Sequence, residues 1–534
     1  FGQNGSILGG GITIESGTVN ILNKALGGAG IDGGLITLGD AANSGKLAVL
    51  NVNGSGFSDV VNQIHVVGTG TRIISATSYS LVHNGAVTLF DGADLYLITN
   101  NPNGSQLNFY GSVSGTGNLV VQANSANANG NSWIRLLTNS VDIDGTITNN
   151  GAGSSGNLSR LETQISAVIG DKVRGVVQDS VNSALTLSGS NIYRGDTQVL
   201  QGTLNLGNVY AVQNSTVNLS AGVMLGLTVG GGANTYYLGG LAGDSNVNVG
   251  ANSLNVGANN ASTVYNGALV GNGNLTKVGA GTLTLTGAST YDGNTTISGG
   301  VLLVNGSGEL TNTGGVYVNT GGTFRYDSVV AFGRGVSLDG GAFHYNSAAD
   351  MDGSDAVLIF NSGKLAGTNW NGAVLSGLTI NTGKVIAPGN SIGIAGTESQ
   401  TWGVGGAYEF ELGNVSGAAG ADWDLLNVSG VLDISSLSAS SFTLQLTGLG
   451  LSGFNAGQNY DWDFVHFASL TGVFDGDLFT VDAVGFGAAY DGEFSVIQSG
   501  GNILALHYEA IPEPSVLALL GIGGVILLIA RRRK

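Results

Sequence analysis

One segment of this chain occurs twice, and that repetition restricts the architecture more than any other feature. The first copy, Ala184 to Asn208, reads ALTLSGSNIYRGDTQVLQGTLNLGN, and the second, Thr282 to Gly306, reads TLTLTGASTYDGNTTISGGVLLVNG. The copies align without a gap, with leucine, tyrosine and glycine at matching positions. A unit of this size cannot bury its apolar face alone, so we expect such units to stack on one another.

The pattern within each copy is that of a β-strand. Thr282 to Thr286 alternates threonine and leucine, which places both leucines on one face of a strand. Gly299 and Gly300 supply corners where φ can be positive. The predicted fold is therefore all-β, a right-handed parallel β-helix, or solenoid, over residues 1–397. A set of β-sandwiches is the alternative, and it predicts regular hairpin signals.

The repeated element, Leu-Thr-Leu-Thr-Gly followed by Tyr-x-Gly-x-Thr and Gly-x-Leu, resembles the autotransporter-associated β-strand repeat of passenger domains. The resemblance is clearest between residues 110 and 310. The series from Ile386 to Gly393, with the strands that follow it, resembles the end of such passengers. The family resemblance implies a β-helix, which favours the solenoid over the sandwiches.

Residues 398–510 differ in composition, and we expect them to form the last turns and a β cap. Aromatic side chains are concentrated there, and an open solenoid end needs covering because it exposes strand edges. The alternative is an exposed aromatic platform for carbohydrate. These aromatic residues are Trp402, Tyr408, Phe410, Trp423, Phe442, Phe454, Tyr460, Trp462, Phe464, Phe467, Phe474, Phe479 and Phe486.

The last 24 residues, 511–534, carry a proline pair, an uncharged segment and a basic end. The uncharged segment has 16 residues, about 24 Å as a helix, and long basic side chains help it to span a core of about 30 Å. The cluster Arg531, Arg532, Arg533 and Lys534 favours the cytoplasmic side. The predicted transmembrane helix comprises Ser515, Val516, Leu517, Ala518, Leu519, Leu520, Gly521, Ile522, Gly523, Gly524, Val525, Ile526, Leu527, Leu528, Ile529 and Ala530.

Pro512, Glu513 and Pro514, followed by the apolar segment and the basic cluster, resemble the PEP-CTERM sorting signal of Gram-negative bacteria. The resemblance implies recognition by an exosortase, a membrane transpeptidase-like enzyme that cuts near the triad. It also implies transient anchoring in the inner membrane, and then release to the cell surface or the extracellular matrix. A plain membrane anchor is the alternative.

Composition narrows the classes of partner and chemistry. With 93 glycines but only 4 prolines the chain is not collagen, and its net charge of −18 disfavours nucleic acid. The chain has no cysteine, so neither disulfides nor a thiol nucleophile is available. The five histidines, His65, His83, His344, His466 and His507, lack the spacing of metal ligands. We expect no cofactor.

Two pairs of carboxylates deserve comparison with glycosidase sites, which need two such groups about 5–10 Å apart. Glu409 with Glu411, and Asp422 with Asp424, are each expected to face one side of a strand. Calcium-binding patterns are partial at Gly27 to Asp32 and at Asp350 to Asp355, where a solvated turn is the simpler interpretation. Chance pairing in an acidic chain accounts for the carboxylates.

The sequence therefore predicts an exported, non-catalytic surface or matrix protein, an adhesin or structural rod that meets exopolysaccharide or neighbouring cells. One alternative is a polysaccharide lyase or hydrolase on the same fold. Another is a structural subunit of a surface layer.

Overall fold

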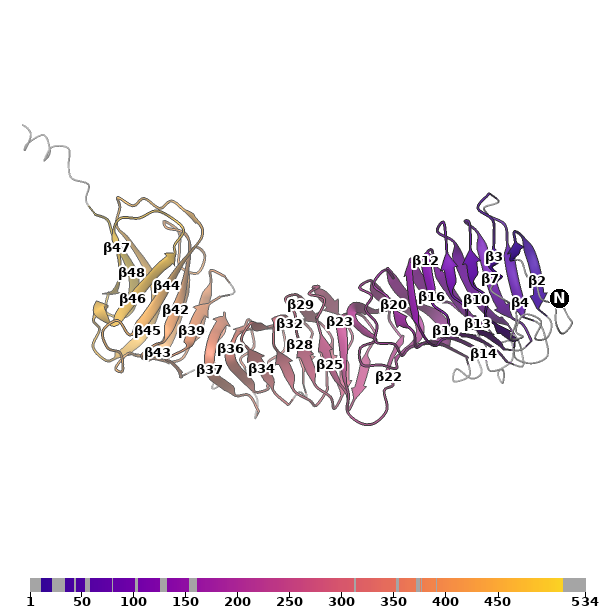
Figure 1. The fold of residues 1–534 in the computed structure, drawn as a ribbon. Helices are drawn as coiled ribbons and strands as arrows, with labels where there is room; N and C mark the ends of the chain where they lie inside the picture. The colour runs from indigo at the N-terminus through magenta and orange to yellow at the C-terminus, as the bar shows by residue number, and fades with distance from the viewer. Residues whose placement is uncertain are drawn as a thin grey trace, which may run out of the picture. The chain divides into compact units, whose positions relative to one another are not determined.

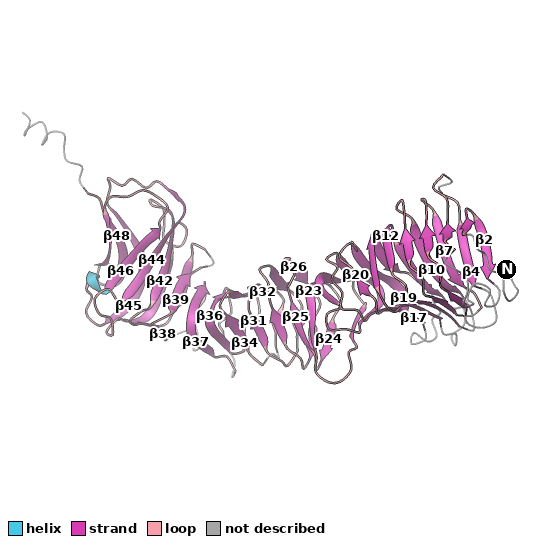
Figure 2. Cartoon of the chain, viewed as in Figure 1, coloured by secondary structure: helices cyan, strands magenta, loops and turns pink. Residues whose placement is uncertain are grey.

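The computed structural model describes residues 11–21, 34–42, 45–52, 58–78, 80–100, 104–124, 132–152, 161–311, 314–351, 355–370, 375, 377–389 and 391–511. These residues form β-strands and one short 3₁₀ helix, η2 (Gly476–Leu478), which confirms the all-β prediction for this part of the chain (Figure 2). The chain divides into two compact units, 1–316 and 317–534, with the division inside β34 (Val316–Asn319).

The first unit consists of parallel strand ladders (Figure 1). Each strand pairs with a strand further along the chain, as Leu95 does with Leu119 and Leu283 with Leu302. The stretch of chain that separates two such paired residues is called a circuit below. One ladder comprises β1 (Ile12–Ile14), β3 (Ile36–Leu38), β6 (Ile64–Val66), β9 (Val87–Leu89), β12 (Val113–Thr116), β15 (Ser140–Asp144) and β18 (Val168–Ile169).

A second ladder runs through the whole unit. It comprises β2 (Gly17–Ile21), β4 (Ala48–Val52), β7 (Thr71–Ala76), β10 (Asp94–Asn100), β13 (Leu119–Asn124), β16 (Thr146–Asn149), β19 (Gly175–Leu187), β20 (Asp196–Leu206), β21 (Val212–Leu219), β23 (Thr235–Gly243), β26 (Thr263–Tyr265), β29 (Thr282–Leu285) and β32 (Gly300–Gly306).

A third ladder ends in the middle of the unit. It comprises β5 (Ser58–Val60), β8 (Leu81–His83), β11 (Ser105–Phe109), β14 (Ser132–Leu136), β17 (Leu161–Ile165), the second halves of β19 and β20, and β22 (Met224–Leu227). Beyond it lie shorter ladders of β25 (Ser253–Val256), β28 (Leu275–Lys277) and β31 (Thr295–Ile297), of β24 (Val247–Gly250) and β27 (Leu269–Gly271), and of β30 (Ala288–Ser289) and β33 (Glu309–Leu310).

Alternation along the strands builds the core of the first unit. In β29 both leucines are buried while both threonines are half-buried, as the sequence pattern predicts. Parallel register then stacks like side chains, so that Leu185, Leu204 and Leu225 follow one another across three strands. At the corner between β31 and β32, Gly300 has a φ of 60°, and a Cβ there would lie 2.5 Å from the carbonyl oxygens of Gly279 and Gly281.

The second unit is built from two sheets. One comprises β35 (Gly322–Ser328), β36 (Val336–Tyr345), β37 (Leu358–Gly367), β39 (Lys384–Pro388), β42 (Ala407–Asn414), β44 (Phe442–Ser452) and β46 (Phe479–Gly485), all paired in parallel. The other comprises β38 (Leu378–Ile380), β40 (Ile394–Thr397), β41 (Gln400–Trp402), β43 (Leu425–Asp433), β45 (Tyr460–Thr471), β48 (Ile503–Glu509) and β47 (Glu493–Ser499). Its last two pairings, β45 with β48 and β48 with β47, are antiparallel.

Aromatic side chains fill the second unit. Of the aromatic residues identified in the sequence, Phe454, Tyr460 and Phe474 are half-buried and the others are buried. Trp402 stacks on Phe442 with ring centroids 4.5 Å apart, and Phe464 meets Tyr408 edge-on at 5.2 Å. These residues form a core and not an exposed platform. The antiparallel strands lie within the region expected to form a cap; that they seal an end stays a prediction, as does the boundary at residue 397.

Candidate ligand-binding groove

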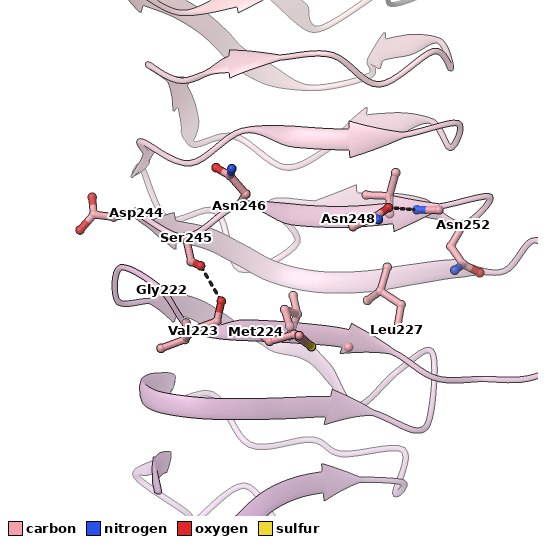
Figure 3. A pocket seen from close by; sticks show the side chains of 13 residues that line it. Gly222, Val223, Met224, Leu227, Asp244, Ser245, Asn246, Asn248 and Asn252 are labelled. Atoms are coloured by element: carbon pink, nitrogen blue, oxygen red, sulfur yellow. Dashed lines mark hydrogen bonds between the residues drawn. The ribbon is translucent and has the colours of Figure 1, made fainter. Parts of the chain in front are cut away.

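A groove of about 780 Å³ opens in the first unit between β22 and β24 (Figure 3). The third ladder stops at β22, which pairs with β20 on one side. The next strand on this face, β24, pairs with β27 on its far side. Within residues 161–311, all of which are described, no strand pairing joins β22 to β24, so a free strand edge borders the groove on each side.

An unusual connection accompanies this break. After β22 the chain passes through Gly230, Gly231 and Gly232, and the last two have φ values of 100° and 119°. The Tyr236 hydroxyl accepts a hydrogen bond from the Val229 N–H at 2.8 Å, and the Asn234 side chain donates to the Val229 carbonyl at 3.1 Å. The glycine-rich loop therefore has a defined path, held at its two ends.

The hydrogen bonds around the groove show which main-chain groups face it. The Thr228 N–H donates to the Leu206 carbonyl at 3.1 Å, toward β20, whereas the Val223 carbonyl accepts from Ser245 Oγ at 2.5 Å, toward the next circuit. Successive residues of a strand present their N–H and C=O groups to opposite edges. The main-chain groups of Leu225 and Leu227 therefore point into the groove.

The opposite edge follows the same rule. The Val247 N–H donates to the Ala268 carbonyl at 2.9 Å, away from the groove, so the main-chain groups of its neighbour Asn248 face β22. The Asn248 side chain accepts a hydrogen bond from the Gly250 N–H at 2.9 Å (Figure 3). The groove is thus bordered by peptide groups on both sides.

The side chains that line the groove are mixed in polarity. Met224 is 61% exposed, an unusual value for an apolar residue, and the polar residues include Asp244, Asn246 and Asn248, all exposed. Asp244 is the one ionisable residue of the lining, and no lining residue is aromatic. The lining therefore does not contain the two carboxyl groups that a typical glycosidase site requires.

The structure confirms that Glu409 and Glu411 face the same side of a strand. Both are half-buried on β42, while Tyr408, Phe410 and Leu412 point to the core. Glu409 is paired with Lys364, whose Nζ lies 3.2 Å from both carboxylate oxygens. Burial and the neighbouring Glu409 raise the pKa of Glu411, and Lys364 opposes them. An ion pair accounts for Glu409 without a catalytic role.

The prediction that Asp422 and Asp424 share one side of a strand is wrong, because β43 begins only at Leu425. Asp422 lies in a turn, where its side chain accepts a hydrogen bond from the Ala418 N–H at 2.9 Å. Asp424 is buried and accepts from the N–H groups of Gly393 and Glu411, at 2.9 and 2.8 Å. It therefore ties the Ile386–Gly393 segment to β42.

Asp424 is buried strongly enough to change its protonation. Burial raises its pKa to about 8, and Glu411 and Glu409 act in the same direction, while the two N–H donors oppose the shift. The side chain is only 1% exposed, so no substrate can reach it. The carboxyl group has a structural role that holds two segments together.

Other candidates from the sequence remain separate. His507 contacts Asp461 at 2.6 Å and His466 contacts Asp463 at 3.4 Å, and no group of three or more potential metal ligands occurs among the described residues. The calcium-like segment Gly27 to Asp32 lies outside those residues, as do residues 352–354 of the second one.

Pro512, Glu513, Pro514, the segment Ser515 to Ala530 and the basic cluster Arg531 to Lys534 also lie outside the described residues. Among the residues that are described, no helix has the length and apolar character that crossing a membrane requires. The predicted sorting signal therefore stays a prediction.

Sequence reasoning missed the groove between β22 and β24. The signal that could have found it is the run of three glycines, Gly230 to Gly232, which interrupts the alternating strand pattern. Which strand edges this interruption leaves unpaired depends on the register of the neighbouring circuits, and the sequence does not show that register.

Two comparisons with known proteins bear on this fold. The family model described as passenger-associated-transport-repeat matches residues 183–206 and 275–304, which overlap both repeat copies and confirm the predicted autotransporter-type repeats. The chain is 30% identical over 307 residues to the adhesin BmaC autotransporter of Brucella suis biovar 1 (strain 1330). That alignment covers 52% of this chain and 8% of the relative, so the chain spans only a small part of that relative's length.

Proposed function

We propose that this protein is an exported, non-catalytic adhesin of the cell surface or extracellular matrix. The observation that carries the proposal is the coincidence of autotransporter-type repeats with stacked parallel ladders, in a chain that is also similar to an autotransporter adhesin. Stacked ladders present long surfaces built from solvated side chains, which suit binding to a partner. The carboxylates do not favour an enzyme, since Glu409 is ion-paired and Asp424 is inaccessible.

The fold we propose for the first unit is a right-handed parallel β-helix. The parallel pairing of strands one circuit apart supports this assignment, and right-handed connections are the rule for parallel strands. The acidic composition, a net charge of −18, keeps such a surface soluble and repels nucleic acid. Exopolysaccharide and neighbouring cell surfaces are the partners we propose for the whole protein.

Sorting through the C-terminal signal completes the proposal. An exosortase would recognise Pro512, Glu513 and Pro514, with Ser515 to Ala530 as a transient inner-membrane helix and Arg531 to Lys534 as its cytoplasmic anchor. The order of these three elements supports it. Final attachment at the surface or in the matrix follows cleavage.

The test is the C-terminal mass of the protein recovered from its native cells, fractionated into inner membrane, surface and medium. We expect loss of Ser515 to Lys534 and recovery of the body at the surface. An intact C-terminus held in the inner membrane would make the tail a plain anchor. Glu513→Ala should block processing, while Glu509→Ala, outside the triad, should not.

Adhesion is tested separately, by attachment of native cells to polysaccharide-coated and cell-coated surfaces with and without the gene for this chain. We expect attachment to fall at least about tenfold when the protein is absent. Unchanged attachment contradicts the adhesive role, whatever the processing result. Turnover of polysaccharide by the purified protein would contradict the non-catalytic assignment.

A further inference from the structure

Two tyrosine rings lie stacked on the outer surface of the first unit, outside the lining of the groove. Tyr210 and Tyr237 have ring centroids 4.9 Å apart and an angle of 21° between their planes. Tyr210 precedes β21 and is 40% exposed, while Tyr237 is a half-buried, outward-facing residue of β23. Nearby tyrosines such as Tyr236 and Tyr265 are buried in the core, so the exposure of this pair sets it apart.

One face of the Tyr237 ring is left uncovered. Tyr210 comes from the preceding circuit, since β21 pairs with β23 between Val212 and Leu238, and it covers the face of Tyr237 on that side. On the side of the following circuit, parallel register places Asn255 beside Tyr237. Asparagine is shorter than tyrosine, so the outer part of the Tyr237 ring projects past it and presents a free face.

The outward column continues from Tyr237 through Asn255, Thr276 and Thr296. The strands β23, β25 and β28 lie side by side (Figure 1), and β31 pairs with β28. Neighbouring strands are about 4.8 Å apart, so the column is about 14 Å long. Tyr237 with these three residues is named the Tyr237 shelf.

The polar groups of the shelf are available to a ligand. Asn255, Thr276 and Thr296 are half-buried, as outward-facing residues of a sheet are. Within the described part of the chain their side chains make no hydrogen bond. Their amide and hydroxyl groups can therefore donate to and accept from a bound molecule.

The shelf lies in a weakly charged part of an acidic chain. Residues 207–311 contain four charged residues, Asp244, Lys277, Asp292 and Glu309. Asp244 borders the groove and Lys277 is buried, and none of the four belongs to the shelf. The chain as a whole carries a net charge of −18, so an acidic ligand is repelled and finds no cation on the shelf to offset that repulsion.

We infer that the Tyr237 shelf binds a neutral polysaccharide, with one sugar ring stacked on the free face of Tyr237 and the next sugars hydrogen-bonded to Asn255, Thr276 and Thr296. The carbon-bound hydrogens of a sugar pack against an aromatic face, and its hydroxyls bond to amides and hydroxyls. The spacing of the strands is close to the length of one sugar residue in an extended polysaccharide. The inference rests on the proposed adhesive role and names the class of polysaccharide and its site.

The composition of this face disfavours a protein partner. Protein interfaces have a buried apolar centre, in which aliphatic and aromatic side chains are packed. In β25, β28, β31 and the part of β23 that pairs with β25, the ring of Tyr237 is the one apolar group that faces outward. The outward residues there are Thr235, Tyr237, Ser253, Asn255, Thr276 and Thr296.

The test measures binding of the full chain to hexasaccharides by isothermal titration calorimetry. The neutral probes are hexasaccharides of glucose, galactose, mannose and N-acetylglucosamine, and the acidic probes are those of glucuronate and galacturonate. We expect at least one neutral probe to bind with a Kd below about 1 mM, and the acidic probes to bind at least about tenfold more weakly. The inference is overturned if no neutral probe reaches that affinity, or if an acidic probe binds as tightly.

Matched substitutions locate the site. Tyr237→Ala removes the ring and should weaken binding of the neutral probe about tenfold, whereas Tyr237→Phe keeps the ring and should change it less than about threefold. Thr276→Val keeps the shape of the side chain, removes its hydroxyl and should weaken binding about fivefold. Tyr110→Ala, at an exposed tyrosine that is not on the shelf, should leave binding unchanged.

Thermal unfolding of each variant shows whether it is folded, and Tyr237→Phe and Thr276→Val alter the least volume. If Tyr237→Ala binds the neutral probe as tightly as the wild type does, the saccharide lies elsewhere and the inference is wrong. Unchanged binding by Thr276→Val removes the polar column from the site.

The length of the ligand gives a further test. Because the shelf spans four strands, affinity should rise from the monosaccharide to the tetrasaccharide and then level off. An affinity that is already complete with the monosaccharide contradicts the assignment of an extended polysaccharide.

The outcomes separate this inference from the proposed function. If cells attach through the protein but no neutral probe binds, the inference fails and the adhesive role stands. If a neutral probe binds and depends on Tyr237, but attachment is unchanged when the protein is absent, the shelf is a saccharide site and only the proposed function fails.

Discussion

Both units of this protein are built mainly from parallel strands, with the antiparallel pairings of β48 only in the second, but they fill their interiors differently. In the first, parallel register stacks aliphatic side chains, as in the series Leu185, Leu204 and Leu225. In the second, aromatic rings meet between two sheets, with Trp402 stacked on Phe442. The comparison shows that alternation along parallel strands decides which side chains are buried in both units. The shape of those side chains then decides how they pack against one another.

Buried polar groups join neighbouring parts of the fold in both units. In the first unit they accept or donate within one circuit or to the next, as Tyr193 and Ser215 do through Thr197. In the second, the Asp424 carboxylate accepts from Gly393 and Glu411, which precede it by 31 and 13 residues. Burial shifts the pKa of one titratable group in each unit, and the two shifts are opposite. It lowers the pKa of Lys277 in the first unit and raises the pKa of Asp424 in the second.

The largest expected effect is a pH dependence confined to the second unit. The folded state raises the pKa of Asp424 from 3.8 to about 8, so it binds a proton that the unfolded chain releases. The stabilisation is complete below about pH 4 and is lost as pH rises to about 8, up to about 6 kcal/mol. Denaturant unfolding followed by tryptophan fluorescence measures it, since four of the five tryptophans, Trp370, Trp402, Trp423 and Trp462, lie in this unit.

Asp424→Asn should flatten that pH profile whatever its effect on absolute stability. Asp422→Asn is the matched control, because Asp422 lies in a turn outside the core, and it should leave the slope unchanged. A profile of the Asp424 variant that still falls between pH 4 and 8 would assign the dependence to another group.

The next effect compares the two cores directly. Trp402→Ala removes a fully buried ring with aromatic neighbours on several sides and should lower the free energy of unfolding by about 4 kcal/mol. Leu283→Ala removes one member of a leucine series and should cost about 3 kcal/mol. Both are measured by denaturant unfolding. If replacing the exposed Val404 by Ala lowered the free energy of unfolding as much, the two losses could not be assigned to buried side chains.

Lys277→Met should destabilise the first unit by about 2 kcal/mol. The Nζ of this buried lysine donates to the carbonyls of Val278, Gly279 and Gly299, at 2.7, 3.0 and 3.1 Å, and the variant leaves these acceptors unpaired. Thermal unfolding measures the change. The control is Lys172→Met, whose exposed ion pair with Asp142 should matter by less than about 1 kcal/mol.

The same lysine predicts a pH slope opposite in sign to that of Asp424. Burial lowers the pKa of Lys277 from 10.5 to about 8, so the folded state binds this proton more weakly than the unfolded chain does. Stability of the wild-type first unit should therefore rise between about pH 8 and 10.5, and Lys277→Met should remove that rise. A slope that persists in the variant contradicts the assignment.

The smallest expected effect concerns the conserved position of tyrosine in the two repeat copies. The Tyr291 hydroxyl lies 2.5 Å from Thr295 Oγ1, as that of Tyr193 lies 2.6 Å from Thr197 Oγ1. Tyr291→Phe should lower the free energy of unfolding by about 1 kcal/mol. Tyr110→Phe, at an exposed residue, should change it by less than half of that. No difference between the two variants would show that the buried hydroxyl contributes nothing.

Local sequence predicted the strands and the interior residues well. The alternation in Thr282 to Thr286 determines which side chains face inward, because a strand has a period of two. The equivalent tyrosines of the two copies are both buried, and Glu409 and Glu411 lie on one face as expected. Such properties depend on a few neighbouring residues, so the sequence alone determines them.

Contacts between distant segments were decided by the tertiary structure. The hydrogen bonds of Asp424 to the N–H groups of Gly393 and Glu411 depend on where three segments meet. Asp422 lies in a turn and not in the expected strand, because β43 begins only at Leu425. The free edges of β22 and β24 depend likewise on the register between circuits. Register is a property of neighbouring strands and not of either strand alone, which is why the groove was not visible in the sequence.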